Sequence, residues 1–137
     1  MKTSAFHVLR VGLAITFMWI GILIIANPVA WGSYIQPWAQ DLLPGSLRSA
    51  MLVTGMLDIS IGIFLVFNAY TWVAALFAVL HILVVFTTSG INSGTVRDIG
   101  LLAASMAIAM HAWPDRFKFW EKKKKYGSSI PDDSSAF

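Results

Sequence analysis

Cysteine is absent from the 137-residue chain, and this absence limits its chemistry. Disulfides, thiolate metal sites, iron–sulfur clusters and dithiol exchange all need cysteine sulfur, so this chain cannot build any of them. A redox role must therefore use a bound cofactor or a partner protein. The sequence also lacks a Gly-rich phosphate loop, an H-E-x-x-H motif and a G-x-S-x-G elbow. It thus assigns no catalytic side chain and no metal ligand.

Charged residues are scarce as well. They make up 12% of the chain, whereas hydrophobic residues make up 57% and the mean hydropathy is +0.69. A soluble domain has roughly 25% charged and 45–50% apolar residues. This composition excludes an ordinary soluble domain and predicts an integral membrane protein.

The apolar residues form four blocks, at residues 5–26, 46–69, 71–89 and 96–113. Each approaches the ~20 residues that a helix needs to cross ~30 Å of hydrocarbon. None shows the alternation of a barrel strand. We therefore expect an all-α fold, an integral membrane four-helix bundle within residues 1–113. Residues 114–137 are expected to be a cytoplasmic basic segment and a disordered tail.

Basic residues predict the orientation, because Lys and Arg in short flanking segments favour the cytoplasmic side. Lys2 precedes the first block and most other basic residues follow the fourth, so both termini are expected in the cytoplasm, with the protein multi-pass in the cell inner membrane. We interpret the lysine run of the tail as a topology anchor on the lipid surface rather than as a nucleic-acid site. This run is Lys122, Lys123, Lys124 and Lys125.

The first loop, "NPVAWGSYIQPWAQDLLPGS" at residues 27–46, is long for a connection between bundle helices. Its apolar residues recur at helical spacing, and Pro37 suits the first position of a new helix. We expect two short helical turns lying in the membrane interface. Trp31, Tyr34 and Trp38 are expected to anchor them at headgroup level on the non-cytoplasmic side.

Asp58 is an acid in the middle of the second block, at nearly the same depth as His81 in the third. A charge at mid-membrane costs at least ~2.5–3.5 kcal/mol, so Asp58 is expected to face the bundle and to have a partner in His81 or Arg10. Two interpretations stay open. The group is either a buried polar clasp that fixes helix register or a site that binds or protonates a ligand.

Arg97 and Asp98 open the fourth block at the outer interface. An acid in the first turn of a helix complements its dipole, and Arg can extend to the headgroups, so a structural role is the simpler interpretation. A ligand-binding role is the alternative. Glycines 55 and 62 flank Asp58 and predict close packing of the second helix against a neighbour.

Three segments together resemble the DoxX family of small four-helix membrane proteins. They are "LRVGLAITFMWIG" at residues 9–21, "GMLDISIGIFL" at residues 55–65, with its Gly-x-x-acid-x-x-x-Gly pattern, and "RDIGLLAASMAIA" at residues 97–109. Some members of that family are quinone-linked membrane partners in thiosulfate oxidation or in oxidative-stress complexes. The resemblance therefore implies a redox accessory role.

Taken with this resemblance, the sequence predicts an accessory subunit of a redox-linked membrane complex that binds a quinone or a lipid near Arg10, Asp58 and His81 and docks a redox partner. A quinone needs an apolar slot with one or two polar groups for its carbonyls. A small oligomeric proton-coupled transporter or channel subunit, with Asp58 as the coupling acid, is the first alternative. A pure scaffold without a site is the second.

Overall fold

The computed structural model describes residues 3–92 and 94–114, and all regular elements in this part of the chain are helical. Lys2 and the tail with its lysine run lie outside the described residues. The elements are α1 (Thr3–Ala26), α2 (Pro28–Gly32), α3 (Pro37–Gln40), α4 (Leu47–Val66), α5 (Thr71–Ser89), the 3-10 helix η1 (Thr95–Arg97) and α6 (Asp98–His111).

Three of these helices, α1, α4 and α5, are long and apolar enough to cross a membrane. They have 24, 20 and 19 residues. The membrane character predicted from composition agrees with this finding. The fourth helix, α6, has only 14 residues, and at ~1.5 Å per residue it is shorter than the ~30 Å hydrocarbon layer.

The helix bounds follow the predicted blocks with small differences at the ends. The second block was expected to reach residue 69, but α4 ends at Val66 because the chain then makes a tight turn with Asn68 and Tyr70 at φ 55° and 49°. Residues with left-handed backbone cannot continue a right-handed helix. The fourth block begins with the 3-10 turn η1 and its α-helix ends at His111 rather than at residue 113.

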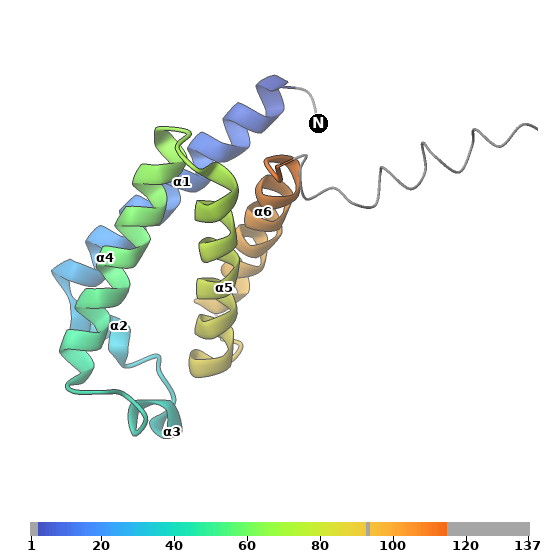
Figure 1. Cartoon of the computed structure of the whole chain (residues 1–137). Coiled ribbons are helices and arrows are strands. Elements are labelled where there is room, and N and C mark those ends of the chain that lie inside the picture. Colours follow the sequence, from blue (N-terminus) through green and yellow to red (C-terminus); the bar gives the residue numbers. More distant parts are fainter. Residues whose placement is uncertain (1–2, 93, 115–137) are drawn as a thin grey trace, which may run out of the picture.

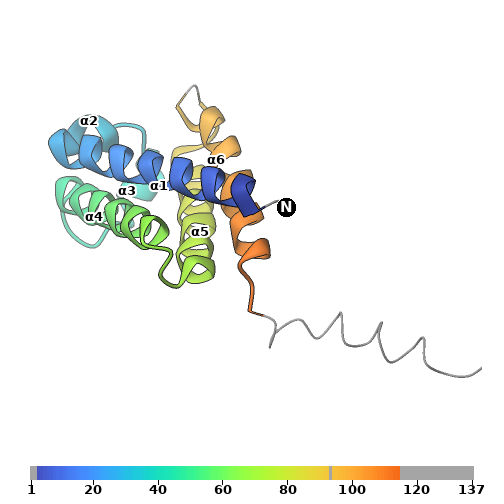
Figure 2. The ribbon, with the colours of Figure 1, turned by 90° about the horizontal axis from the view of Figure 1, so that it is seen from above.

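Neighbouring helices pack in a closed order: α1 on α4, α4 on α5, α5 on α6, and α6 back on α1 (Figure 1). Helix α1 is tilted across the others, so its first turns reach α6 (Figure 2). There the ring of Phe6 lies 4.6 Å from that of His111. The start of α1, the α4–α5 turn and the end of α6 therefore lie at one end of the molecule, and α2 and α3 lie at the other.

Glycines bring α1 and α4 into close contact. A Cβ atom added at Gly21 would lie 2.6 Å from the carbonyl oxygen of Gly55, and one added at Gly62 would lie 2.8 Å from the carbonyl oxygen of Ala14. Only hydrogen fits at these positions. The close packing predicted from glycines 55 and 62 is confirmed, and it holds Asp58, which lies between them, against the interior.

Between Asp58 and the α4–α5 turn the core is apolar. Helices α1, α4, α5 and α6 all contribute deeply buried residues to it, among them Leu13, Ala14, Ile61, Leu65, Ala75, Ala78 and Ile108. These residues fill the half of the molecule between Asp58 and the α4–α5 turn.

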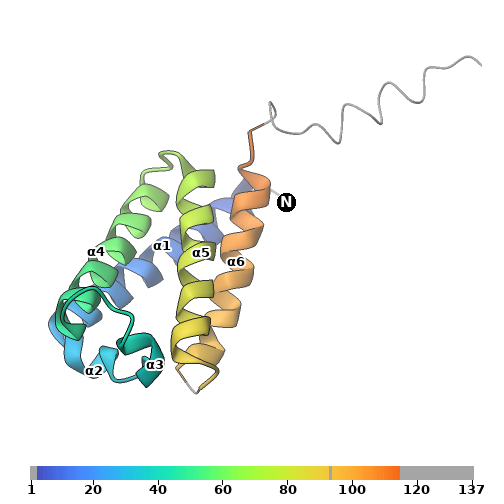
Figure 3. The same cartoon turned by 60° about the horizontal axis from the view of Figure 1, so that its bottom comes forward.

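The first loop contains two short helices, as predicted, and Pro37 is the first residue of the second one. Pro28 starts α2 in the same way. After α2 the chain crosses from the α4 side to the end of α5 (Figure 3). The backbone N–H of Gln36 donates to the carbonyl oxygen of Thr88 at 2.9 Å, which ties the loop to the last turn of α5.

Candidate functional site

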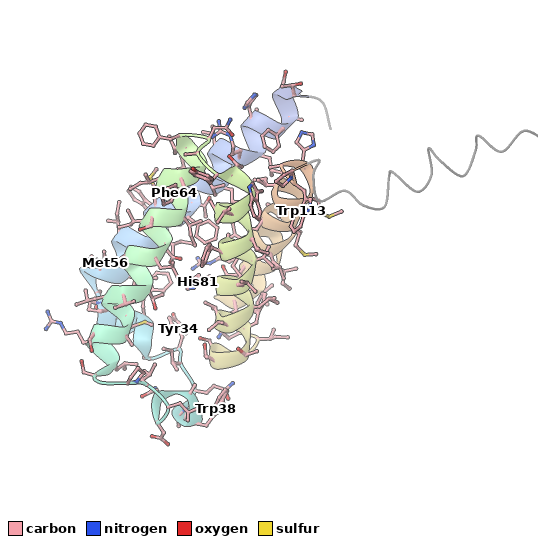
Figure 4. The ribbon with its side chains drawn as sticks, viewed as in Figure 1. Tyr34, Trp38, Met56, Phe64, His81 and Trp113 are labelled. Atoms are coloured by element: carbon pink, nitrogen blue, oxygen red, sulfur yellow. The ribbon has the colours of Figure 1, made fainter. Side chains whose placement is uncertain are left out.

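Asp58 and His81 form a pair between α4 and α5. The Asp58 residue is 2% exposed, and its Oδ1 lies 3.0 Å from Nε2 of His81. Figure 4 shows His81 reaching from α5 toward α4 at about mid-height. The prediction that Asp58 faces the bundle beside a basic partner is confirmed, and the partner is His81.

Arg10 is placed differently from the expectation. Its guanidinium donates to the carbonyl oxygens of Leu65 and Val66, the latter at 2.8 Å, and not to Asp58. The last carbonyls of a helix have no intrahelical donor, and the negative end of the helix dipole attracts a cation. Arg10 therefore caps α4 at the opposite end from the candidate ligand site, and the expectation that it reaches the Asp58 layer is corrected.

A cavity of about 490 Å³ opens beside the Asp58–His81 pair. It lies between the α2–α3 end of the molecule and its middle, and α1, α4, α5 and α6 all contribute to its wall. Most of the wall is apolar, including Phe17, Ile20, Ile24, Met51, Ile82, Val85 and Leu101. This size falls within the ~300–1,000 Å³ of small-molecule sites.

Arg97 and Asp98 line the same cavity. The turn before them is held by Asn92 and Thr95, where the buried Thr95 hydroxyl donates to the carbonyl oxygen of Gly90 at 2.8 Å. Asp98 starts α6, as predicted, and its side chain is 18% exposed. The Arg97 side chain is 62% exposed, with Nε 3.9 Å from Asp98. The structure thus brings Asp58, His81, Arg97 and Asp98 around one space, but not Arg10.

Two aromatic residues of the first loop also line the cavity. Trp31 is half-buried there, although it was expected as a surface anchor, and its ring lies 6.4 Å from that of Tyr34. Figure 4 shows Tyr34 below His81, and Trp38 farther out at the end of the molecule. Trp38 is 51% exposed, as suits an anchor. The roles of Tyr34 and Trp31 were missed because the spacing of the loop does not show which way it folds back.

The carboxylate of Asp58 is not fully satisfied. Although Nε2 of His81 is near, Oδ1 of Asp58 has no hydrogen-bond donor in the part of the chain that the structure describes. Residues 3–92 and 94–114 contain no cluster of three or more His, Asp or Glu side chains that could bind a metal ion. An apolar cavity with a few polar groups at one point suits an amphipathic organic ligand.

Comparisons with protein-family models, with curated proteins and with solved structures find no match to this chain.

Proposed function

We propose that the protein is a DoxX-like inner-membrane subunit that binds a quinone in this cavity and serves a redox-linked membrane complex. The observation that supports this most is that Asp58 and His81 stand together on the wall of an otherwise apolar cavity. A quinone has a polar head and an apolar ring and tail. The paired side chains would meet the head, and the apolar wall would cover the ring.

The proposed topology has four passes with both termini in the cytoplasm, and α6 together with η1 as the short fourth pass. In support, the start of α1 and the end of α6 lie at the same end of the molecule (Figure 1). The cavity then opens toward the non-cytoplasmic half of the membrane, where Trp38 would anchor the loop in the headgroup layer.

The proposed accessory role rests on the absence of redox-active cysteine in this chain. Without cysteine it has no thiol couple and no cluster ligands. A bound quinone would therefore exchange electrons with a redox partner protein, and this chain would supply the binding site. A homo-oligomer is compatible with the same role.

Tryptophan fluorescence tests quinone binding, because Trp31 lines the cavity. The purified full chain in detergent is titrated with decylubiquinone. Saturable quenching is expected, with most of it lost in Trp31→Phe and kept in Trp38→Phe. His81→Ala is expected to weaken binding, whereas Ser60→Ala, which changes an exposed residue of the same helix as Asp58, is the matched control. Quenching that neither His81→Ala nor Trp31→Phe alters would refute the site.

A proton-coupled transporter is the second candidate, since a second carboxyl group, Asp98, lines the cavity together with Asp58. Two acids in one space could pass a proton between them. However, buried Leu65, Ala78 and Ile108 fill the bundle between Asp58 and the far end. Uptake of solute by vesicles in response to a pH gradient, lost in Asp58→Asn, would favour the transporter. A pure scaffold would show neither uptake nor quinone binding.

A further inference from the structure

A second hollow lies on the outer surface of the molecule, between α1 and α6, and we call it the α1–α6 groove. Helix α1 meets α6 through Phe6 and His111 at one end, and because α1 is tilted, the groove lies between the two helices toward the other end (Figure 2). It follows α1 from Ile15 to Leu23, a length of ~12 Å. Its wall consists of Ile15, Thr16, Trp19, Ile20, Leu23, Trp31, Arg97 and Leu101.

The α1–α6 groove is open to the outside and mostly apolar. Ile15, Trp19 and Leu23 are 55%, 63% and 39% exposed. The hydroxyl of Thr16 donates to the carbonyl oxygen of Gly12 in the same helix at 2.9 Å, so it is already engaged. Burial of a polar group here would leave it without partners, whereas a hydrocarbon chain needs none. The groove therefore suits an apolar chain.

The groove and the cavity beside Asp58 share part of their walls. Ile20, Trp31, Arg97 and Leu101 line both spaces. One layer of side chains thus separates them. The Arg97 side chain is 62% exposed, and its Nε lies 3.9 Å from Asp98, which is too long for a hydrogen bond. Arg97 can therefore rotate away from this layer without losing that contact as a hydrogen bond.

We propose that the ligand enters the cavity from the lipid between α1 and α6, and that its hydrocarbon tail stays in the α1–α6 groove while its polar head lies beside His81. This inference rests on the proposed function and adds the route of entry and the place of the tail. Membrane quinones carry long apolar tails. Since lipid is as apolar as the groove, the tail gains packing there rather than release from water.

The first test uses a ubiquinone analogue with a photoreactive diazirine at the end of its alkyl tail. The full chain in lipid vesicles is irradiated with this analogue, digested and analysed by peptide mass spectrometry. Adducts are expected on Ile15, Trp19 or Leu23, which line the groove and not the cavity. Excess decylubiquinone is expected to remove them, which separates bound analogue from analogue that is only dissolved in the lipid.

The failures of this test are distinguishable. If the adducts that decylubiquinone removes are confined to the exposed face of α4 or α5, at Val53 or Phe77, or to Met51 inside the cavity, the inference is wrong while quinone binding stands. If decylubiquinone removes no adduct at any residue, the proposed function itself is wrong.

The second test closes the groove. Thr16→Phe places a larger side chain in it, so decylubiquinone should bind at least about tenfold more weakly. An analogue with a methyl group in place of the decyl tail should bind as it does to wild-type protein. Val8→Phe, at an exposed position of the same helix that lines neither space, is the matched control and should change neither affinity.

Unchanged binding of decylubiquinone to Thr16→Phe, or equal weakening of both analogues, would overturn the inference. The labelling experiment needs no variant, so it decides the inference even if Thr16→Phe does not fold. Gel filtration shows whether that variant does.

Discussion

At the scale of single residues, the pairing of Asp58 with His81 rather than with Arg10 determines how a substitution of Asp58 should affect stability and ligand binding. If Asp58 were paired with a buried arginine, removing the acid would leave the arginine's positive charge buried without a partner, which is strongly destabilising. Arg10 is not the partner, and a histidine can lose its proton instead. Removing Asp58 should therefore cost less stability than breaking a carboxylate–guanidinium pair would. Its main effect should be on ligand affinity rather than on the free energy of unfolding.

Asp58→Leu is accordingly expected to fold but to bind the ligand at least about tenfold more weakly. A hydrogen bond between the carboxylate and the ligand contributes ~1.4 kcal/mol or more to binding. Thermal unfolding in detergent and titration with decylubiquinol measure the two effects separately. A variant that unfolds on purification, or one that binds as wild-type protein does, would show that the pair has a different role.

Substitution of Arg10 should affect stability and not ligand binding. Its guanidinium satisfies carbonyl oxygens at the end of α4 and lies away from the cavity. Arg10→Ala should lower the free energy of unfolding by about 1.5–3 kcal/mol, the value of hydrogen bonds to a charged group, and leave quinone affinity unchanged. Arg10→Lys should recover part of the stability. Equal loss of affinity and stability would instead place Arg10 near the ligand.

At the scale of elements, the α1–α4 contact positions one wall of the site. A Cβ atom added at Gly55 would lie 2.8 Å from Cγ1 of Ile25 and 2.9 Å from the carbonyl oxygen of Gly21. The two helices can approach this closely only because both positions are glycine. A side chain here must push α4, and Asp58 with it, away from α1.

Gly55→Val should therefore destabilise the protein by ~1–3 kcal/mol or more, as overpacking does, and should also weaken ligand binding. Gly12→Ala is the matched control, because a Cβ atom there meets nothing within 4 Å. It should leave stability unchanged or slightly raised. Thermal unfolding of both variants checks this prediction, and equal effects of the two would contradict a close α1–α4 contact.

The elements also show what the sequence could and could not predict. Long apolar runs predicted the three long helices, and Pro37 predicted the start of α3, because these signals are local. The Asp58–His81 contact was predictable from depth along a hairpin. The direction of Arg10 was not, because a long side chain can reach either way along a helix. The gathering of Trp31 and Asp98 at one cavity depends on how two loops fold back, which residue spacing does not record.

At the scale of the whole molecule, the topology is open to a direct test, since the chain has no cysteine to remove first. Single cysteines at Ser33, after α2, and at Ser129, in the tail, should react with a membrane-impermeant maleimide from opposite sides of the membrane. The basic residues at both ends of the chain are the reason to expect the tail in the cytoplasm. Labelling of both positions from the periplasmic side would contradict the four-pass arrangement.

The most direct test of the central claim, that the cavity beside Asp58 and His81 binds a quinone, is photolabelling with a photoreactive ubiquinone analogue followed by peptide mass spectrometry. We predict adducts on residues that line the cavity, such as Met51 and Ile82, and their loss when decylubiquinol or decylubiquinone is added in excess. Labelling confined to the exposed face of α4, at Val53 and Met56, and unaffected by competitor would mean that the analogue only meets the outer surface, and would contradict the claim.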